Sequence, residues 1–199
     1  MRSMNEHNKR QNIFLRLQVK KWKSAIYVTE SADLINWSKP TPALTDAKGY
    51  EKSNRGSEIS NPFILRENGI NRMYYSCGMT FIKDCGFCEP TYIGYAKSRD
   101  ISKGYVSAAK PIISPDKNNP YLNLCSGCLK VYKLRDGYIG IQNGLYEKDG
   151  HSHSAIILLT SADGLSFEFK KIRMIREEFR MITPMDLRTK TFKKTAVGG

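Results

Sequence analysis

Three segments of the chain repeat one pattern, and this repeat constrains the fold more than any other feature. In each copy an apolar run leads into Ser-x-Asp, and an aromatic residue follows four or five positions after the Asp. The copies are AIYVTESADLINW at 25–37, YIGYAKSRDISKGY at 92–105 and AIILLTSADGLSF at 155–167. Self-similarity at an interval of about 65 residues indicates a repeat architecture.

The chemistry of the repeat predicts a strand that ends in a sharp turn. The apolar run barely alternates with polar residues, which predicts a strand that is buried on both faces. The Ser and Asp side chains can accept hydrogen bonds from backbone N–H groups two or three residues later, so the chain should fold back there. A second apolar stretch follows each turn, at 42–44, 111–113 and 172–175.

Two predicted hairpins precede the second and third copies. Residues 61–78 and 126–144 each contain two apolar stretches, joined by Asn68-Gly69 and by Asp136-Gly137. These dipeptides are strong signals for tight hairpin turns. A full repeat is therefore four antiparallel strands, and an all-β propeller built of such blades is expected. The alternative is a β-sandwich whose segments are similar by coincidence.

The repeat also predicts the organisation of the chain. We expect a disordered polar N-terminus at 1–12, propeller blades over 13–182 and a basic C-terminal tail at 183–199. Within the blades, 13–45 should form a partial blade, and 58–115 and 124–175 should each form a complete one.

Several of these motifs together resemble a known superfamily. N-P-F-I-L at 61–65, R-M-Y-Y-S at 72–76, Y-I-G-Y-A-K-S-R-D at 92–100 and S-A-D-L-I-N-W at 31–37 are similar to the five-bladed propeller glycosidases of glycoside hydrolase families 43, 32, 68 and 130. The resemblance implies an incomplete propeller of about three of five blades. It also implies a carbohydrate partner, and hydrolysis of O-glycosyl bonds if the complete propeller is active.

The sequence departs from that superfamily at the places where the resemblance implies catalytic carboxylates. Asn61 stands where the family has an Asp before the proline, and no carboxylate occurs around 125–127, where the family's acid would lie. Two alternatives therefore stay open. One is a non-catalytic sugar-binding propeller fragment, and the other is a zinc-stabilised protein-interaction module.

The candidate catalytic residues are Glu58 and Glu89. Glu89 precedes Pro90 at the start of a predicted buried strand, where loss of water should raise the pKa of a carboxyl into the range of a general acid. Glu58 lies just before Asn61. The candidate sugar-binding residues, which we assign to the same face of the propeller, are Asn61, Tyr75, Ser126, Asn143, His151 and His153.

Two C-x-x-C pairs form a candidate metal site. Cys85 with Cys88, and Cys125 with Cys128, have the spacing of zinc ligands within each pair. Stacked blades could bring the pairs together, so a zinc ion that ties two blades is the one cofactor that the sequence suggests. The alternatives are reduced thiols that fill gaps in loops and a redox-sensitive pair.

Charge and hydropathy limit the classes of partner and the cellular location that the sequence predicts. The formal charge is +13, but no recognised nucleic-acid module accompanies it, so nucleic acid is not an expected partner. The longest apolar run, 155–159, is too short to span a bilayer, and the first residues lack a secretion signal, which predicts a cytoplasmic protein. The resemblance to propeller glycosidases implies a role in carbohydrate metabolism. An incomplete ring leaves apolar surface uncovered, so self-association through the open propeller edge is also expected.

Overall fold

The computed structural model describes residues 22–45, 48–53 and 56–169. Apart from one turn of 3-10 helix, Gly49–Glu51, every regular element in these ranges is a β-strand. The predicted all-β fold class is therefore confirmed. The predicted termini at 1–12 and 183–199 lie outside the described residues, as do the blade segments 13–21 and 170–182.

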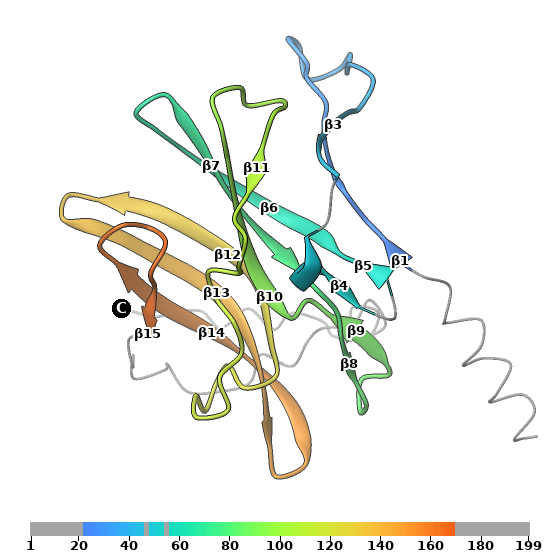
Figure 1. Ribbon diagram of the computed structural model, residues 1–199, viewed down its shortest axis with the longest axis vertical. Helices are drawn as coiled ribbons and strands as arrows, with labels where there is room; N and C mark the ends of the chain where they lie inside the picture. The colour runs from blue at the N-terminus through green and yellow to red at the C-terminus, as the bar shows by residue number, and fades with distance from the viewer. Residues whose placement is uncertain (1–21, 46–47, 54–55, 170–199) are drawn as a thin grey trace, which may run out of the picture.

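Two four-stranded antiparallel sheets form the body of the molecule (Figure 1). Blade 2 consists of β6 (Ile59–Glu67), β7 (Ile70–Cys77), β10 (Tyr92–Ser98) and β11 (Val106–Ser107). Blade 3 consists of β12 (Cys125–Leu134), β13 (Gly137–Lys148), β14 (His151–Ser161) and β15 (Glu168–Phe169). In both blades the four strands lie in the sheet in the order in which they occur in the chain, as the repeat predicts.

Smaller sheets surround this body. The first copy of the repeat forms the partial blade, in which β2 (Ile26–Val28) pairs antiparallel with β3 (Thr41–Leu44). A three-stranded sheet joins the two sides of the partial blade in the chain. It contains β1 (Trp22–Lys23), which precedes the partial blade, and β5 (Gly56–Ser57) and β4 (Lys52–Ser53), which come after it. Between the second and third strands of blade 2, the chain forms a further hairpin of β8 (Thr80–Ile82) and β9 (Phe87–Glu89).

The central strands of blade 2, β7 and β10, are mostly buried because a sheet packs against each side. Along β7, Tyr74 joins a core with Leu129 and Ile157 of blade 3. The flanking residues Met73 and Tyr75 point the other way, into a core that includes Ile26 and Leu44 of the partial blade. This packing explains why the apolar runs of the sequence do not alternate.

The Ser-x-Asp turns form as predicted. In blade 3, Asp163 Oδ1 accepts hydrogen bonds from the backbone N–H groups of Leu165 and Ser166 at 2.7 and 2.8 Å. The N–H of Gly164 donates to Ser161 Oγ at 2.9 Å. In the partial blade, Asp33 accepts two backbone N–H groups in the same way. These bonds hold the pKa of Asp33 and Asp163 below the ordinary value.

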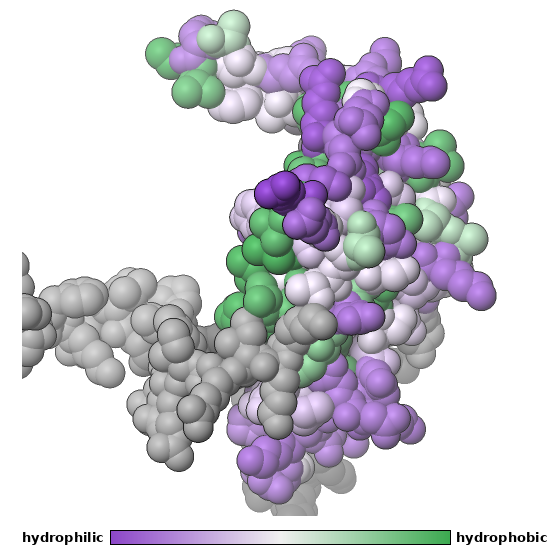
Figure 2. Space-filling view, turned by 90° about the vertical axis from the view of Figure 1, so that its left-hand side faces the viewer, coloured by the Kyte–Doolittle hydropathy of each residue, from purple (hydrophilic) through white to green (hydrophobic). Residues whose placement is uncertain are grey.

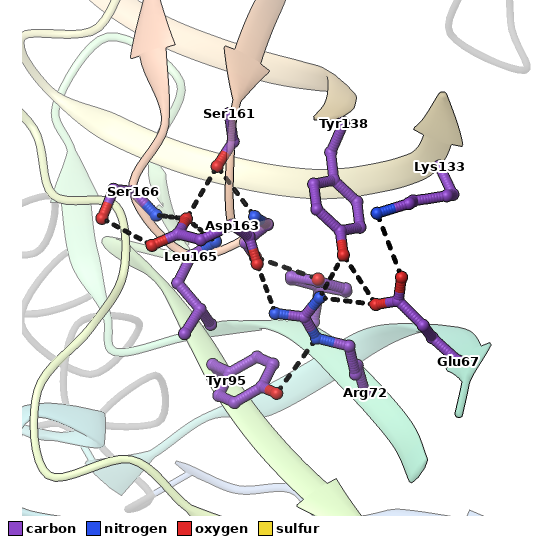
Figure 3. Close-up of polar contacts among 11 residues, drawn as sticks. Glu67, Arg72, Tyr95, Lys133, Tyr138, Ser161, Asp163, Leu165 and Ser166 are labelled. Carbon is purple, nitrogen blue, oxygen red and sulfur yellow. Dashed lines mark hydrogen bonds and ion pairs between the residues drawn. The ribbon is translucent and has the colours of Figure 1, made fainter. Parts of the chain in front are cut away.

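A single arginine joins blade 2 to this turn of blade 3 (Figure 3). Arg72 of β7 donates from Nη2 to the carbonyl oxygen of Asp163 at 2.6 Å, and from Nη1 to Tyr138 Oη at 3.0 Å. It also donates from Nε to Tyr95 Oη and forms an ion pair with Glu67 at 3.0 Å. The Arg72 side chain is only 11% exposed, and its guanidinium N–H groups donate hydrogen bonds to protein groups.

We predict that Arg72→Met destabilises the fold, because it leaves the Asp163 carbonyl without its partner and takes Arg72 away from Glu67, which keeps Lys133 and Tyr138. Loss of the partner of a largely buried hydrogen-bonding group costs about 1–3 kcal/mol of unfolding free energy. Urea denaturation of the wild type and the variant measures this loss. Arg66→Met is the matched control, because Arg66 lies on the neighbouring strand β6 and is exposed. Equal losses in both variants would contradict this role of Arg72.

We also predict that Asp163 makes the fold sensitive to acid. Backbone N–H groups lower the pKa of Asp163 from 3.8 to about 2. A carboxyl with a lowered pKa stabilises the folded state above its ordinary pKa, and this stabilisation is lost as the pH falls toward 2. Tm measured between pH 5 and 2 should therefore fall less steeply in Asp163→Asn than in the wild type. Asp149→Asn, at the exposed turn between β13 and β14, should leave the slope unchanged.

Candidate functional site

Two half-buried glutamates come together beside the first strand of blade 2. Glu58 lies directly before β6, and Glu89 is the last residue of β9. Burial raises the pKa of Glu58; the hydrogen bond from Ser60 Oγ, 2.9 Å long, opposes this rise, and the charge of Glu89 adds to it. Burial likewise raises the pKa of Glu89. Both carboxyls therefore keep their protons to a higher pH than an ordinary glutamate does.

The first strands of the two blades carry β-bulges at matching positions. The register of β6 shifts between Ser60 and Phe63, and that of β12 shifts between Gly127 and Lys130. The first extra residue in each bulge, Asn61 and Cys128, has a φ of 48° and is exposed. Three residues earlier stand Glu58 in blade 2 and Cys125 in blade 3. We call β6 and β12, the first strands of the two blades, the inner strands. A carboxyl thus stands at the start of the inner strand of blade 2, and a thiol stands at the same place in blade 3.

Backbone contacts fix the start of β12 against blade 2. The N–H of Ser126 lies 3.1 Å from the carbonyl oxygen of Pro90, the residue after Glu89. The N–H of Cys128 donates to Ser76 Oγ at 2.9 Å. Ser126 was a predicted sugar contact, but its side chain is fully buried, and its hydroxyl has no hydrogen-bond partner among the described residues.

A buried glutamate that sequence reasoning missed supports this region. Glu51 is fully buried at the end of the 3-10 helix, and Tyr75 Oη donates to its carboxylate. The backbone carbonyl of Glu51 accepts the N–H of Glu58 at 3.2 Å, so Glu51 helps to set the position of the site carboxyl. The sequence around Gly49-Tyr50-Glu51 carries no motif that could have revealed this role.

Tyr75 supports Glu51 and does not offer a stacking surface for a sugar. We predicted Tyr75 as a sugar-binding residue, but its side chain is only 1% exposed. Its ring lies across Gly94 of the neighbouring strand, where a Cβ atom would come within 2.4 Å of the ring. Glycine is therefore required at position 94 for this packing.

The two predicted histidines lie in a second group, at the tip of the β13–β14 hairpin. They belong to strand β14. His153 stacks on Tyr146 with ring centroids 5.3 Å apart. Between the histidines, Ser152 donates from its N–H and its hydroxyl to Asp84 of the β8–β9 hairpin, at 2.7 and 2.8 Å. These contacts tie the hairpin tips of blades 2 and 3 together.

Asn143 lies apart from both groups. It pairs with Gly127 and Ile156 in the sheet of blade 3. Alternation along β13 places it on the same face as the exposed Ile141, away from the face that packs on blade 2.

The cysteines occupy different environments. Cys125 is buried with Ile82 and Leu145, and burial raises the pKa of its thiol to about 12. Cys128 is exposed on the bulge of β12, but partial loss of water around its sulfur raises the pKa of the thiol. Cys85 is exposed, with its sulfur 3.3 Å from Ser152 Oγ, and Cys88 is half-buried. Within the described ranges, no three residues among His, Cys, Asp and Glu converge in a way that could hold a metal ion. The zinc site stays a prediction.

Solved structures share this arrangement of blades. A family 117 glycoside hydrolase from the marine bacterium Zobellia galactanivorans matches 75% of the chain with a TM-score of 0.57 and 15% identity, and the match covers 42% of that enzyme. A thermostable family 43 glycoside hydrolase matches 73% with a TM-score of 0.54 and 21% identity, over 47% of its length. A family 32 β-fructofuranosidase from Bombyx mori matches 72% with a TM-score of 0.52 and 18% identity, over 27% of its length.

The fold is that of a glycosidase β-propeller. The predicted incomplete propeller is thereby confirmed, and the chain spans less than half the length of each of these three propeller enzymes. No protein-family model matches the sequence, and a comparison with curated proteins finds no match. Over the part of the chain that the structure describes, no helix has the length and apolar character that crossing a membrane would require.

We predict that Glu58→Gln stabilises the protein at neutral and basic pH. Because burial raises the pKa of Glu58 above its ordinary value of 4.5, the charged form destabilises the folded state as the pH rises above that value. The glutamine keeps an oxygen that can accept the Ser60 hydroxyl but never ionises. Tm should therefore be higher in the variant at pH 8 and similar to the wild type at pH 4. The exposed control Glu147→Gln should match the wild type at both pH values.

Proposed function

We propose that this chain is part of a propeller that acts on a carbohydrate at the Glu58–Glu89 site. One observation carries the proposal: two half-buried carboxyls, one directly before β6 and one at the end of β9, lie close enough for the charge of Glu89 to raise the pKa of Glu58. Most enzymes that hydrolyse a glycosidic bond use two carboxyl groups that lie on either side of it. The fold shared with glycoside hydrolases of families 117, 43 and 32 supports the same class of substrate.

In this proposal the two carboxyls divide the work of hydrolysis. The protonated carboxyl donates its proton to the glycosidic oxygen, so that the bond from this oxygen to the anomeric carbon breaks. The other carboxylate either activates a water molecule or attacks the anomeric carbon itself. Glu89 suits the role of the acid, because burial alone raises its pKa, whereas Glu58 also accepts the Ser60 hydroxyl in its charged form.

A second candidate function is sugar binding without hydrolysis. It is favoured by the two matching bulges, where Asn61 and Cys128 project from the inner strands and neither is a carboxylate. An exposed amide can donate and accept hydrogen bonds with sugar hydroxyls. In this alternative, Glu58 and Glu89 would orient a sugar and leave its glycosidic bond intact.

We predict that the chain hydrolyses at least one member of a panel of 4-nitrophenyl glycosides. Glu58→Gln and Glu89→Gln should each lower kcat/KM by about 100-fold or more, because a positioned acid or base contributes at least this much. Glu147→Gln on the exposed part of β13 is the matched control and should keep full activity. Release of nitrophenolate, followed by absorbance, is the measurement.

The same experiment separates the two functions. Full activity in both glutamine variants would reject the assignment of the site. Binding of a glycan with no turnover, lost in Asn61→Ala, would favour the binding function. The cytoplasmic location and the role in carbohydrate metabolism stay predictions.

A further inference from the structure

The β8–β9 hairpin carries Glu89 outside the four-stranded sheet of blade 2. Glu89 is the last residue of the hairpin, where it pairs with Thr80. Each strand of the hairpin has only three residues, and the two strands form a small sheet of their own. An isolated two-stranded hairpin is at best marginally stable in water. The position of Glu89 therefore depends on what this hairpin packs against.

Blade 3 contacts the hairpin at two points. Ile82 is only 3% exposed and packs on Cys125 of β12 and Leu145 of β13. In the turn after Ile82, Asp84 accepts hydrogen bonds from the N–H and the hydroxyl of Ser152 at 2.7 and 2.8 Å. Figure 1 shows the tips of the β8–β9 and β13–β14 hairpins at the lower end of the molecule, and Figure 2 shows hydrophilic residues at the surface of this end. The tip contact is therefore polar, and it is strong for its size because one partner is a carboxylate.

We propose that Asp84 and Ser152 are positioning residues for Glu89, because their contact holds the β8–β9 hairpin, and Glu89 with it, against blade 3. Neither residue touches the reacting bond in this proposal. The inference rests on the role of Glu89 as the acid in the hydrolysis proposed above. It adds that a residue of blade 3, 63 positions after Glu89 in the chain, sets where this acid stands.

The same contact bears on the proton of Glu89. Burial is what raises the pKa of Glu89, so a hairpin that loosens from blade 3 lets water reach the carboxyl and lowers its pKa toward the ordinary value. The titratable groups that interact with the charge of Glu89 are Glu58 before β6 and the thiols of Cys125 and Cys128 on β12. Both thiols have a raised pKa and stay neutral at neutral pH, so Glu58 is the charged neighbour that remains.

The pH dependence of hydrolysis tests the proposal on the full chain. With Glu89 as the acid, kcat/KM falls as the pH rises through the pKa of Glu89. Asp84→Ala should move this fall to lower pH and should reduce kcat by about 10- to 100-fold, with a smaller change in KM, because the acid loses its alignment. Asp84→Asn keeps an oxygen that can accept from Ser152 and should have smaller effects. A profile and a kcat that are unchanged in Asp84→Ala would overturn the proposal.

Asn123→Ala is the matched control for these variants. The Asn123 side chain accepts the backbone N–H of Glu147 at 2.7 Å, so it makes an exposed contact of the same kind, but within blade 3. This variant should keep the wild-type kcat and pH profile. An equal loss in Asn123→Ala and Asp84→Ala would mean that the loss comes from general destabilisation, and it would reject the positioning role.

A disulfide can replace the contact and so test positioning by rescue. The sulfur of Cys85 lies 3.3 Å from Ser152 Oγ, so Ser152→Cys brings two thiols within reach of a bond. In a chain with both Asp84→Ala and Ser152→Cys, oxidised glutathione should accept the two electrons and close this disulfide, which peptide mass spectrometry verifies. The oxidised chain should regain the wild-type kcat and pH profile and lose both in dithiothreitol. Asp84→Ala alone, oxidised in the same way, should regain neither.

Two results of the rescue experiment would contradict the proposal. A disulfide that closes without restoring kcat would show that the hairpin contact does not align the acid. A disulfide that does not close would show that the two hairpin tips do not meet in the folded chain.

Hydrogen exchange tests the contact without a substrate. Amide exchange over residues 80–89 should be about 10-fold faster in Asp84→Ala than in the wild type, because the lost bonds are to a charged group, and it should be unchanged in Asn123→Ala. Equal exchange in all three chains would overturn the proposal, whether or not the chain is active. Faster exchange in Asp84→Ala, with no hydrolysis by the wild type, would reject the proposed function but support the role of Asp84 in holding Glu89 in place.

Discussion

The packing of one sheet on the next is the constraint on which the rest of this structure depends. Tyr74 of β7 lies in the core between blades 2 and 3, and Arg72 of the same strand carries polar contacts from that core to the turn of blade 3. The apolar contacts stabilise the packing of the two blades but do not fix their relative orientation, because the hydrophobic effect is non-directional. The hydrogen bonds of Arg72 are directional, so they favour one orientation of blade 3 on blade 2. Together they set how blade 3 sits on blade 2, and with it the position of every group at the starts of the inner strands.

The candidate site is a consequence of this stacking. Glu58 lies directly before β6 and Glu89 ends β9, and the start of β12 contacts the residue after Glu89 through the hydrogen bond from Ser126 N–H to the carbonyl oxygen of Pro90. Burial raises the pKa of both carboxyls. Glu51 and Tyr75 support the same region from the core beneath it.

The repeated features of the sequence predicted the fold because they act locally. Asn68-Gly69 with φ of 50° and 73° forms the tight hairpin turn, and the Ser-x-Asp motifs cap the turns after the third strands. The candidate site could be predicted only in part. The closeness of Glu58 and Glu89 was expected from the face that they share, but the burial of Tyr75 and Ser126 and the contribution of Glu51 depend on contacts between residues far apart in the chain.

The sequence by itself determined the strands, their order within each blade and the turns that join them, because hydrophobic pattern and turn chemistry act over a few residues. Only the tertiary structure decided which side chains lie together between the blades. It gave the four cysteines of the two C-x-x-C pairs different degrees of burial, placed His151 and His153 near a strand tip beside Asp84, and brought Glu58 and Glu89 to the start of β6. Blade packing decides these positions, because it fixes distances between residues that the local sequence leaves free.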